Sequence, residues 1–111
     1  MNNLSWKEFE KVEMRVGTII KAEEFKEAIN PSYKLWVDFG EYGIKKTSAQ
    51  ITDLYKPNDL ISKQVVAVIN FPLKQIANIQ SECLVLGAIG DNKEITLIST
   101  DKTIKNGLRI G

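Results

Sequence analysis

The sequence contains no histidine among its 111 residues. Histidine is the usual general base near neutral pH, a member of the common nucleophile pairs with serine or cysteine, and a frequent metal ligand. The sequence also has no phosphate-binding glycine loop, no HExxH pair, no CxxC pair and no nucleophile elbow. These absences predict a protein that is not an enzyme, has no catalytic residues, and uses no metal and no cofactor.

Cysteine is nearly absent as well, since Cys83 is the only one in the chain. A single cysteine excludes an intrachain disulfide, and the apolar run of residues 83–86 predicts a small buried side chain at this position. No apolar run reaches the roughly 18 residues that a membrane-spanning helix needs. The polar start Met1-Asn2-Asn3 is not typical of a signal peptide, so we expect a cytoplasmic protein without membrane insertion.

Net charge is also low. The 15 Lys and Arg residues nearly balance the 14 Asp and Glu residues, which leaves a formal charge of +1. No overall electrostatic field therefore attracts a polyanion, and any affinity for nucleic acid has to come from a local cluster of cations. A hydrophobic content of 43% and a length of 111 residues are typical of one globular domain, spanning residues 1–111.

The first residues predict a short N-terminal helix within residues 1–11. Ser5 and Glu8 have the spacing of a capping box, in which the side chain of each accepts a hydrogen bond from the backbone N–H of the other. Trp6 and Phe9 then fall on one face of the helix. We therefore expect this helix to need an apolar surface to cover.

Alternation of apolar and polar residues predicts three strands after this helix. The first covers residues 12–23 and places Ile20 on its apolar face, with Gly17 marking a bend or bulge. The second and third cover residues 33–39 and 44–49 and are separated by a glycine-containing turn.

A short helical segment is predicted next, over residues 50–55, with Pro57 as its terminator. A fourth strand over residues 64–71 is nearly continuous in apolar side chains, as in a strand covered on both faces. After a loop, a fifth strand at 82–89 turns back as a hairpin at 94–98.

This order of elements is that of an all-β OB fold, a five-stranded Greek-key barrel with a short helix between strands 3 and 4. The N-terminal helix and a C-terminal extension over residues 91–111 are added to the barrel. Periodicity alone also allows an SH3-like barrel, but the helix between the third and fourth strands favours the OB fold. The face of an OB barrel and its first and last inter-strand loops commonly bind ligands.

Short motifs along the chain resemble one family. The segment FEKVEMRVGTIIKAEEF at residues 9–25 is followed, in order, by YKL at 33–35, DFG at 38–40, SAQI at 48–51, VINFP at 68–72, SE at 81–82 and LVLG at 84–87. This series is similar to the CsaA-type export chaperones of the tRNA-binding-domain superfamily, and the resemblance spans nearly the whole chain.

The resemblance implies a homodimer of OB barrels that binds unfolded or export-destined preprotein segments. Binding of tRNA is the alternative, and a structural dimer that only scaffolds other proteins would show neither affinity. Dimer contacts are expected from the N-terminal helix and the C-terminal extension. On this chain they fall on Trp6, Phe9 and the turn Asn106-Gly107.

A candidate site for peptide or tRNA lies in the loop between the fourth and fifth strands and on the barrel face beside it. Its aromatic, apolar, amide and cationic side chains are able to stack on and hydrogen-bond a nucleotide, or to hold an extended peptide. We assign to this site Asn70, Phe71, Lys74, Gln75, Ile76, Ser81, Ser48 and Gln50. In the alternative interpretation Phe71 and Ile76 close the end of the barrel, and Ser48 caps the short helix.

Candidate phosphate contacts are Arg15, Lys34 and Lys46, although lysines that alternate with apolar residues commonly lie on the solvent face of a strand. Relatives carry a second proline and an arginine in the ligand loop, then an aromatic and a basic residue before the Ser-Glu pair. This chain has Leu73, Lys74, Ile79 and Gln80 at those positions. The loss of the arginine and of the stacking platform predicts weaker RNA binding and favours a peptide groove.

Overall fold

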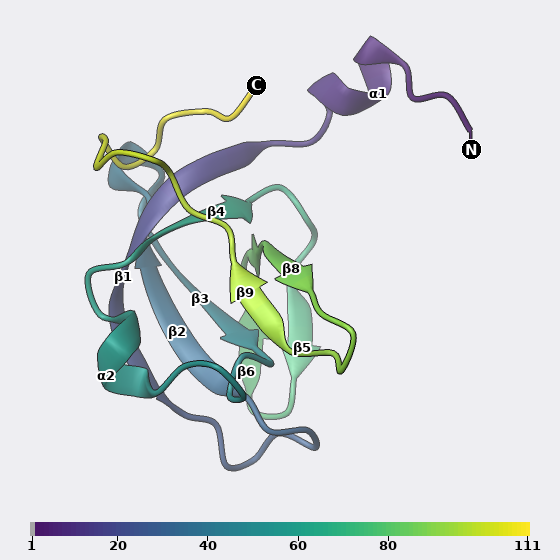
Figure 1. The fold of residues 1–111 in the computed structure, drawn as a ribbon. Coiled ribbons are helices and arrows are strands. Elements are labelled where there is room, and N and C mark those ends of the chain that lie inside the picture. The colour runs from purple at the N-terminus through teal and green to yellow at the C-terminus, as the bar shows by residue number, and fades with distance from the viewer. Residues whose placement is uncertain (1) are drawn as a thin grey trace.

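Five strands form one antiparallel sheet in the computed structural model, which describes residues 2–111 (Figure 1). Met1, which belongs to the predicted range 1–11, lies outside the described residues. The strand order is β3-β2-β1-β4-β7, with β1 at Met14–Glu24, β2 at Tyr33–Asp38, β3 at Ile44–Ala49, β4 at Gln64–Val68 and β7 at Leu84–Val85. The sheet curls into a nearly closed barrel, which confirms the predicted OB-type fold.

Two hairpins and three short helices complete the described structure. The hairpins pair β5 with β6 and β8 with β9, and their strands lie at Lys74–Ile76, Ile79–Ser81, Gly87–Ile89 and Ile95–Leu97. The helices are α1 at Trp6–Glu10, the 3-10 helix η1 at Gly40–Tyr42, and α2 at Pro57–Leu60. No helix among residues 2–111 is long and apolar enough to cross a membrane.

The barrel core comes from side chains that alternate along the central strands. In β2, Leu35 and Val37 are completely buried, and Trp36 between them is only partly covered, as the predicted alternation requires. Ile19 of β1, Val65 of β4 and Leu60 of α2 complete this core with no exposed surface. The alternation therefore sets which face of each strand points inward.

Strand β1 differs from its prediction at two positions. The pairing with β2 shifts between Ile19 and Lys21, so Ile20 is an extra residue that is 45% exposed and does not lie on the apolar face. Gly17 is not the site of this bulge. A Cβ atom on Gly17 would lie 2.6 Å from Val37 and 2.7 Å from the ring of Phe39, so the glycine is needed for close packing.

The helix between β3 and β4 is present, but Pro57 begins it and does not end it. Residues 52–54 form turns, and α2 starts at Pro57, with Lys56 at its N-cap. Proline suits the first helical position because the N–H that it lacks would have no partner there. The prediction of a helical segment over residues 50–55 is therefore wrong.

The predicted long strands at 64–71 and 82–89 are shorter in the structure. Strand β4 ends at Val68, the segment predicted as a loop forms the β5–β6 hairpin, and the strand predicted at 82–89 divides into β7 and β8. The turn of the β5–β6 hairpin includes Ala77 with a φ of 48°. Lys74, Ile76 and Ser81 of this hairpin line the groove described below.

Both ends of the chain approach the same end of β1. Helix α1 lies away from the barrel, whereas the C-terminal segment runs back beside β1 (Figure 1). The N–H of Gly107 donates to the carbonyl of Val16 at 2.7 Å, and the N–H of Ile110 donates to the carbonyl of Met14 at 2.9 Å. The C-terminal extension is therefore fixed on the barrel of its own chain.

Candidate ligand-binding site

A groove of roughly 570 Å³ separates the end of β3 from β7 and β8. Five of the predicted site residues line it, namely Ser48, Gln50, Lys74, Ile76 and Ser81. Its other walls are mainly apolar and include Ile51, Leu84, Ile89 and Ile95. The structure thus brings the loop and the barrel face together as one cavity, which we call the groove.

A second cavity of roughly 450 Å³, the side pocket, adjoins the groove and shares Lys74, Ser81 and Leu84 with it. Phe71 and Leu73 form its rim, with exposed fractions of 56% and 59%. The alternative in which Phe71 closes the barrel end is therefore wrong. Among residues 2–111, Lys74 is the one charged residue that lines either cavity.

Gln75, another of the assigned residues, lines a third cavity of roughly 410 Å³ between the β1–β2 loop and the hairpin turn. Ser48, Gln50 and Ile76 line this cavity too, so it continues from the groove. Ser48 does not cap the short helix, because α2 begins only at Pro57. Seven of the eight assigned residues therefore line three adjoining cavities.

One end of the groove is closed by hydrogen bonds between β3 and the segment before β7. The hydroxyl of Thr47 donates to the carbonyl of Cys83 at 2.7 Å and lies 2.9 Å from the hydroxyl of Ser81. The N–H of Glu82 donates to the carbonyl of Lys46 at 2.8 Å, and the N–H of Lys46 donates to the Glu82 carboxylate at 2.9 Å. Sequence analysis missed Thr47 and Glu82, whose partners are distant in the sequence.

Cys83 lies beneath the groove and is buried, as predicted. Burial is the main reason that the pKa of its thiol rises to about 12. The neutral thiol is a poor nucleophile, since the thiolate is the reactive form. Cys83 therefore acts as a small apolar side chain in the wall of the site.

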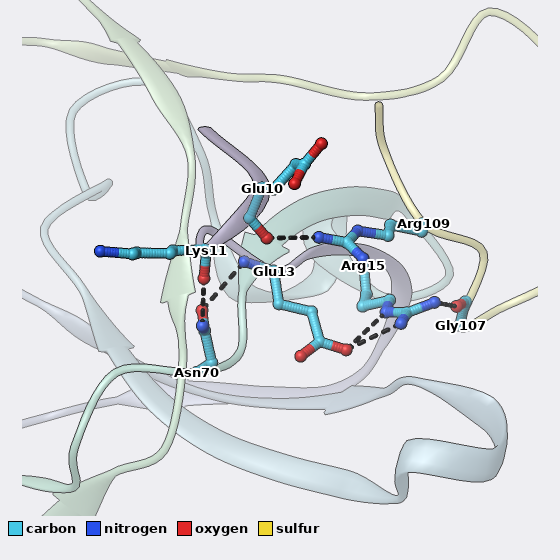
Figure 2. A network of polar contacts seen from close by, with 7 residues as sticks. All are labelled: Glu10, Lys11, Glu13, Arg15, Asn70, Gly107 and Arg109. Atoms are coloured by element: carbon cyan, nitrogen blue, oxygen red, sulfur yellow. Dashed lines mark hydrogen bonds and ion pairs between the residues drawn. The ribbon is translucent and has the colours of Figure 1, made fainter. Parts of the chain in front are cut away.

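The eighth assigned residue, Asn70, does not line the cavities but joins the start of β1 to the end of β4. Its side-chain oxygen accepts a hydrogen bond from the N–H of Glu13 at 3.0 Å, and its amide donates to the carbonyl of Lys11 at 2.6 Å (Figure 2). Both bonds hold the segment that follows α1. Asn70 therefore helps to fix the position of the segment that follows the N-terminal helix.

Arg15 is similarly engaged within its own chain. Its guanidinium donates to Glu13 Oε1 at 2.7 and 3.1 Å and to the carbonyl of Gly107 at 3.1 Å (Figure 2). The guanidinium also lies 4.3 Å from the centre of the Tyr42 ring. In the same network, Arg109 donates to the carbonyl of Glu10 at 2.8 Å. These contacts use the donor groups that a phosphate would need.

The other two candidate phosphate contacts lie in different surroundings. The ammonium of Lys34 is 3.8 Å from Glu23 and 4.0 Å from Glu27, and its side chain is 18% exposed. Lys46 is exposed and has no carboxylate within 4.0 Å among residues 2–111. Lys46 is therefore the member of the predicted set that keeps an exposed, unpaired cation.

The residues assigned to a dimer contact divide into two groups. Trp6 is 81% exposed on α1, next to Leu4 at 69%, and Phe9 is half-buried. Asn106 accepts hydrogen bonds from the Thr18 hydroxyl at 2.7 Å and from the Gln64 amide at 3.2 Å. The turn that contains Asn106 therefore fixes the C-terminal extension on the barrel, whereas α1 leaves apolar side chains uncovered.

Comparison with known proteins gives a consistent set of matches. A family model described as "Putative tRNA binding domain" matches residues 14–109. The crystal structure of chaperone CsaA from Bacillus anthracis is 44% identical, has a TM-score of 0.95, and aligns with 99% of this chain and 100% of that one. The CsaA chaperone protein from Picrophilus torridus is 46% identical, with a TM-score of 0.92 and coverage of 98% and 100%.

A match to a larger protein is confined to one part of it. The methionine–tRNA ligase of Methanocaldococcus jannaschii is 33% identical over 101 residues, which are 91% of this chain and 15% of that enzyme. The chain thus spans about 15% of the length of the curated relatives that it matches. The matched family is a binding domain and not a catalytic one.

Proposed function

This chain belongs to the tRNA-binding-domain family and, within it, to the CsaA-type proteins, and we propose that it is a homodimeric, non-enzymatic, cytoplasmic chaperone for unfolded or export-destined preprotein segments. The observation that carries the proposal is the apolar character of the groove and the side pocket. Phe71, Leu73 and Leu84 are each about half exposed at the rim. Exposed apolar patches of this kind mark protein interaction sites.

The low charge of both cavities supports a polypeptide over a nucleic acid as ligand. Lys74 is the one charged residue lining them among residues 2–111, whereas binding to a phosphate backbone depends on several cations. Unfolded polypeptides expose the apolar side chains that folded proteins bury. The groove therefore suits an apolar segment that has not yet folded.

The homodimer is proposed from the exposure of α1. The helix has five residues, none of which is buried, and carries the uncovered side chain of Trp6. Helices this short are not stable alone in water, although Ser5 and Glu8 cap this one reciprocally. A second copy that covers Leu4 and Trp6 would remove this apolar surface from water.

Deletion of residues 1–10 tests the dimer. We expect the shortened chain to sediment as a monomer or to aggregate, while the full chain sediments as a dimer. A full chain that is monomeric at micromolar concentration, or a shortened chain that stays dimeric, would contradict the proposal.

Titration with a reduced and alkylated preprotein, which stays unfolded, tests the binding function. We expect Phe71→Ala and Ile76→Ala each to weaken binding about 5- to 30-fold, since each removes apolar contact area. Leu54→Ala is the matched control, because Leu54 is 52% exposed and lines none of the three cavities. Equal affinity of all three variants and the original chain would refute the assignment.

Binding of tRNA is the second candidate, favoured by the family match and by the methionine–tRNA ligase relatives. Lys46 and Lys74 have no carboxylate within 4.0 Å among residues 2–111. If both contact phosphates, the affinity for tRNA should fall about tenfold between roughly 50 and 200 mM salt. An affinity that does not change with salt would argue against phosphate contacts.

A further inference from the structure

The groove lies where the barrel is incomplete. Strands β3 and β7 are the two outer strands of the sheet, so each has one edge without a neighbouring strand in the sheet. These edges approach one another, and the bonds from Glu82 to Lys46 and from Thr47 to Cys83 join them at one end. No backbone hydrogen bond joins β3 to β7 among residues 2–111, and residues of both strands line the groove, with β6 lying beside β3.

The pairing of β3 with β2 shows which backbone groups face the groove. In an antiparallel pair, bonded and non-bonded residues alternate. The N–H of Phe39 donates to the carbonyl of Gly43 at 2.9 Å, and with the β2–β3 register this places Lys46 and Ser48 in non-bonded pairs. Their N–H and C=O groups therefore point away from β2, and the bond from Glu82 to the carbonyl of Lys46 agrees with this direction.

Ser48 is the next such residue along β3, and its backbone is open. Its N–H has no hydrogen-bond partner among residues 2–111, and its carbonyl accepts only a long bond of 3.3 Å from the Thr47 hydroxyl. The same alternation applies on the opposite wall. The N–H of Leu86 donates to the carbonyl of Val66, and Val85 falls in the non-bonded pair with Ala67, so its backbone also points away from β4.

We propose that an extended, mainly apolar polypeptide segment binds in the groove as an added strand, with its backbone hydrogen-bonded to the free edge of β3 at Ser48. The proposal rests on the proposed function and adds the mode of binding. Free strand edges pair readily with other chains, and an added strand directs alternate side chains to one side. Those side chains would lie between Ile76, Leu84 and Ile89.

Charge and hydrogen-bonding groups identify the occupant as a polypeptide. The open groups at Ser48 are one neutral donor and one neutral acceptor, which match the N–H and C=O of one peptide residue. Lys74 is the only cation in the lining within the described residues, so a segment with an acidic residue near Lys74 fits best. The ligand is thus recognised by its backbone, which explains how one groove would accept segments of different sequence.

Backbone methylation of the ligand tests this mode without changing the protein. The probe is a synthetic peptide of alternating apolar and polar residues with one glutamate, and two derivatives carry N-methyl groups at the odd or at the even positions. Only one set of amides points toward β3, because a shift by one residue would turn the apolar side chains away from the groove. We expect the derivative methylated on these amides to bind about tenfold more weakly than the unmethylated peptide. If both derivatives bind as tightly as the unmethylated peptide, the proposal is overturned.

Two variants of Ser48 provide an independent measurement. Ser48→Pro removes the N–H, whereas Ser48→Ala removes only the side-chain hydroxyl, so we expect the proline variant to bind the unmethylated peptide about tenfold more weakly than the alanine variant. If Ser48→Pro does not fold, the comparison of the methylated peptides with the unmethylated peptide tests the proposal on its own. The proposal is overturned if the two variants bind the peptide with equal affinity. It is also overturned if the chain binds RNA in a salt-dependent way in place of the peptide and Ser48→Pro weakens that complex.

Failure of this proposal is separable from failure of the proposed function. If the peptide binds, Phe71→Ala weakens it, and both methylated derivatives bind as tightly as the unmethylated peptide, only the added-strand mode is refuted. If neither the peptide nor an unfolded preprotein binds the original chain, the proposed function itself is refuted.

Discussion

Replacement of Gly17 by alanine should strongly destabilise the barrel, because the new methyl group has no room. The added Cβ would lie 2.6 Å from Val37 Cγ1 and 2.7 Å from two atoms of the Phe39 ring. Both neighbours are completely buried, so neither is able to move into solvent. Overpacking of a buried site costs about 1–3 kcal/mol, and we expect Gly17→Ala to lie near about 3 kcal/mol, the upper end of this range.

The assay is urea unfolding followed by tryptophan fluorescence, with a thermal scan at the same protein concentration. A loss of about 3 kcal/mol should lower Tm by roughly 10–15 °C for a chain of this size. Gly111→Ala is the control, since its Cβ would meet no atom within 4 Å. Protein concentration has to be equal because the stability of a dimer depends on it. A Gly17→Ala chain that unfolds within about 0.5 kcal/mol of the original chain would refute this packing argument.

Three further outcomes follow from single contacts. Thr47→Val should cost about 1–2 kcal/mol because it leaves the carbonyl of Cys83 with a weaker partner, and Thr47→Ser should recover most of this in urea unfolding. The pKa of the Cys83 thiol is raised from 9.0 to about 12 in the folded chain, so its contribution to stability is complete below pH 9 and is lost as the pH rises toward 12. The unfolding free energy should therefore fall by about 1.4 kcal/mol per pH unit in that window relative to Cys83→Ala. Asn70→Ala should weaken the proposed dimer at least about fivefold in sedimentation, since two bonds that position the segment after α1 disappear.

The parts of the fold that the sequence predicts are those specified by local patterns. The alternation in residues 33–39 predicts the buried set of β2, and the spacing of Ser5 and Glu8 predicts the cap of α1. The bulge at Ile20 does not change the alternation of apolar and polar residues along β1. It is recognised only from the residues of β2 with which Ile19 and Lys21 pair. Pro57 is compatible with either the end or the start of a helix, so the sequence alone leaves its place open.

The grouping of the candidate site residues was predictable where they are close in sequence, whereas the intrachain partners of Asn70 and Arg15 were not, because these partners are distant in the sequence. Lys74, Ile76 and Ser81 lie on one hairpin, so their grouping follows from one loop. Asn70 has the composition of a ligand contact, but its partners lie 57 and 59 residues away in the chain. Likewise Arg15 reaches Gly107 across 92 residues. A polar side chain alone does not show whether its partner is a ligand or its own backbone.

The network in Figure 2 relates the proposed dimer to the ligand site. Asn70 holds the segment after α1, and the next residue in the chain, Phe71, lies at the rim of the side pocket. Arg109 holds the end of α1 from the C-terminal extension. These bonds hold the C-terminal end of α1, whereas Leu4 and Trp6 at its other end stay exposed. The polar network therefore connects the segment after α1, where the dimer contact is proposed, to the residue that precedes Phe71 in the proposed ligand loop.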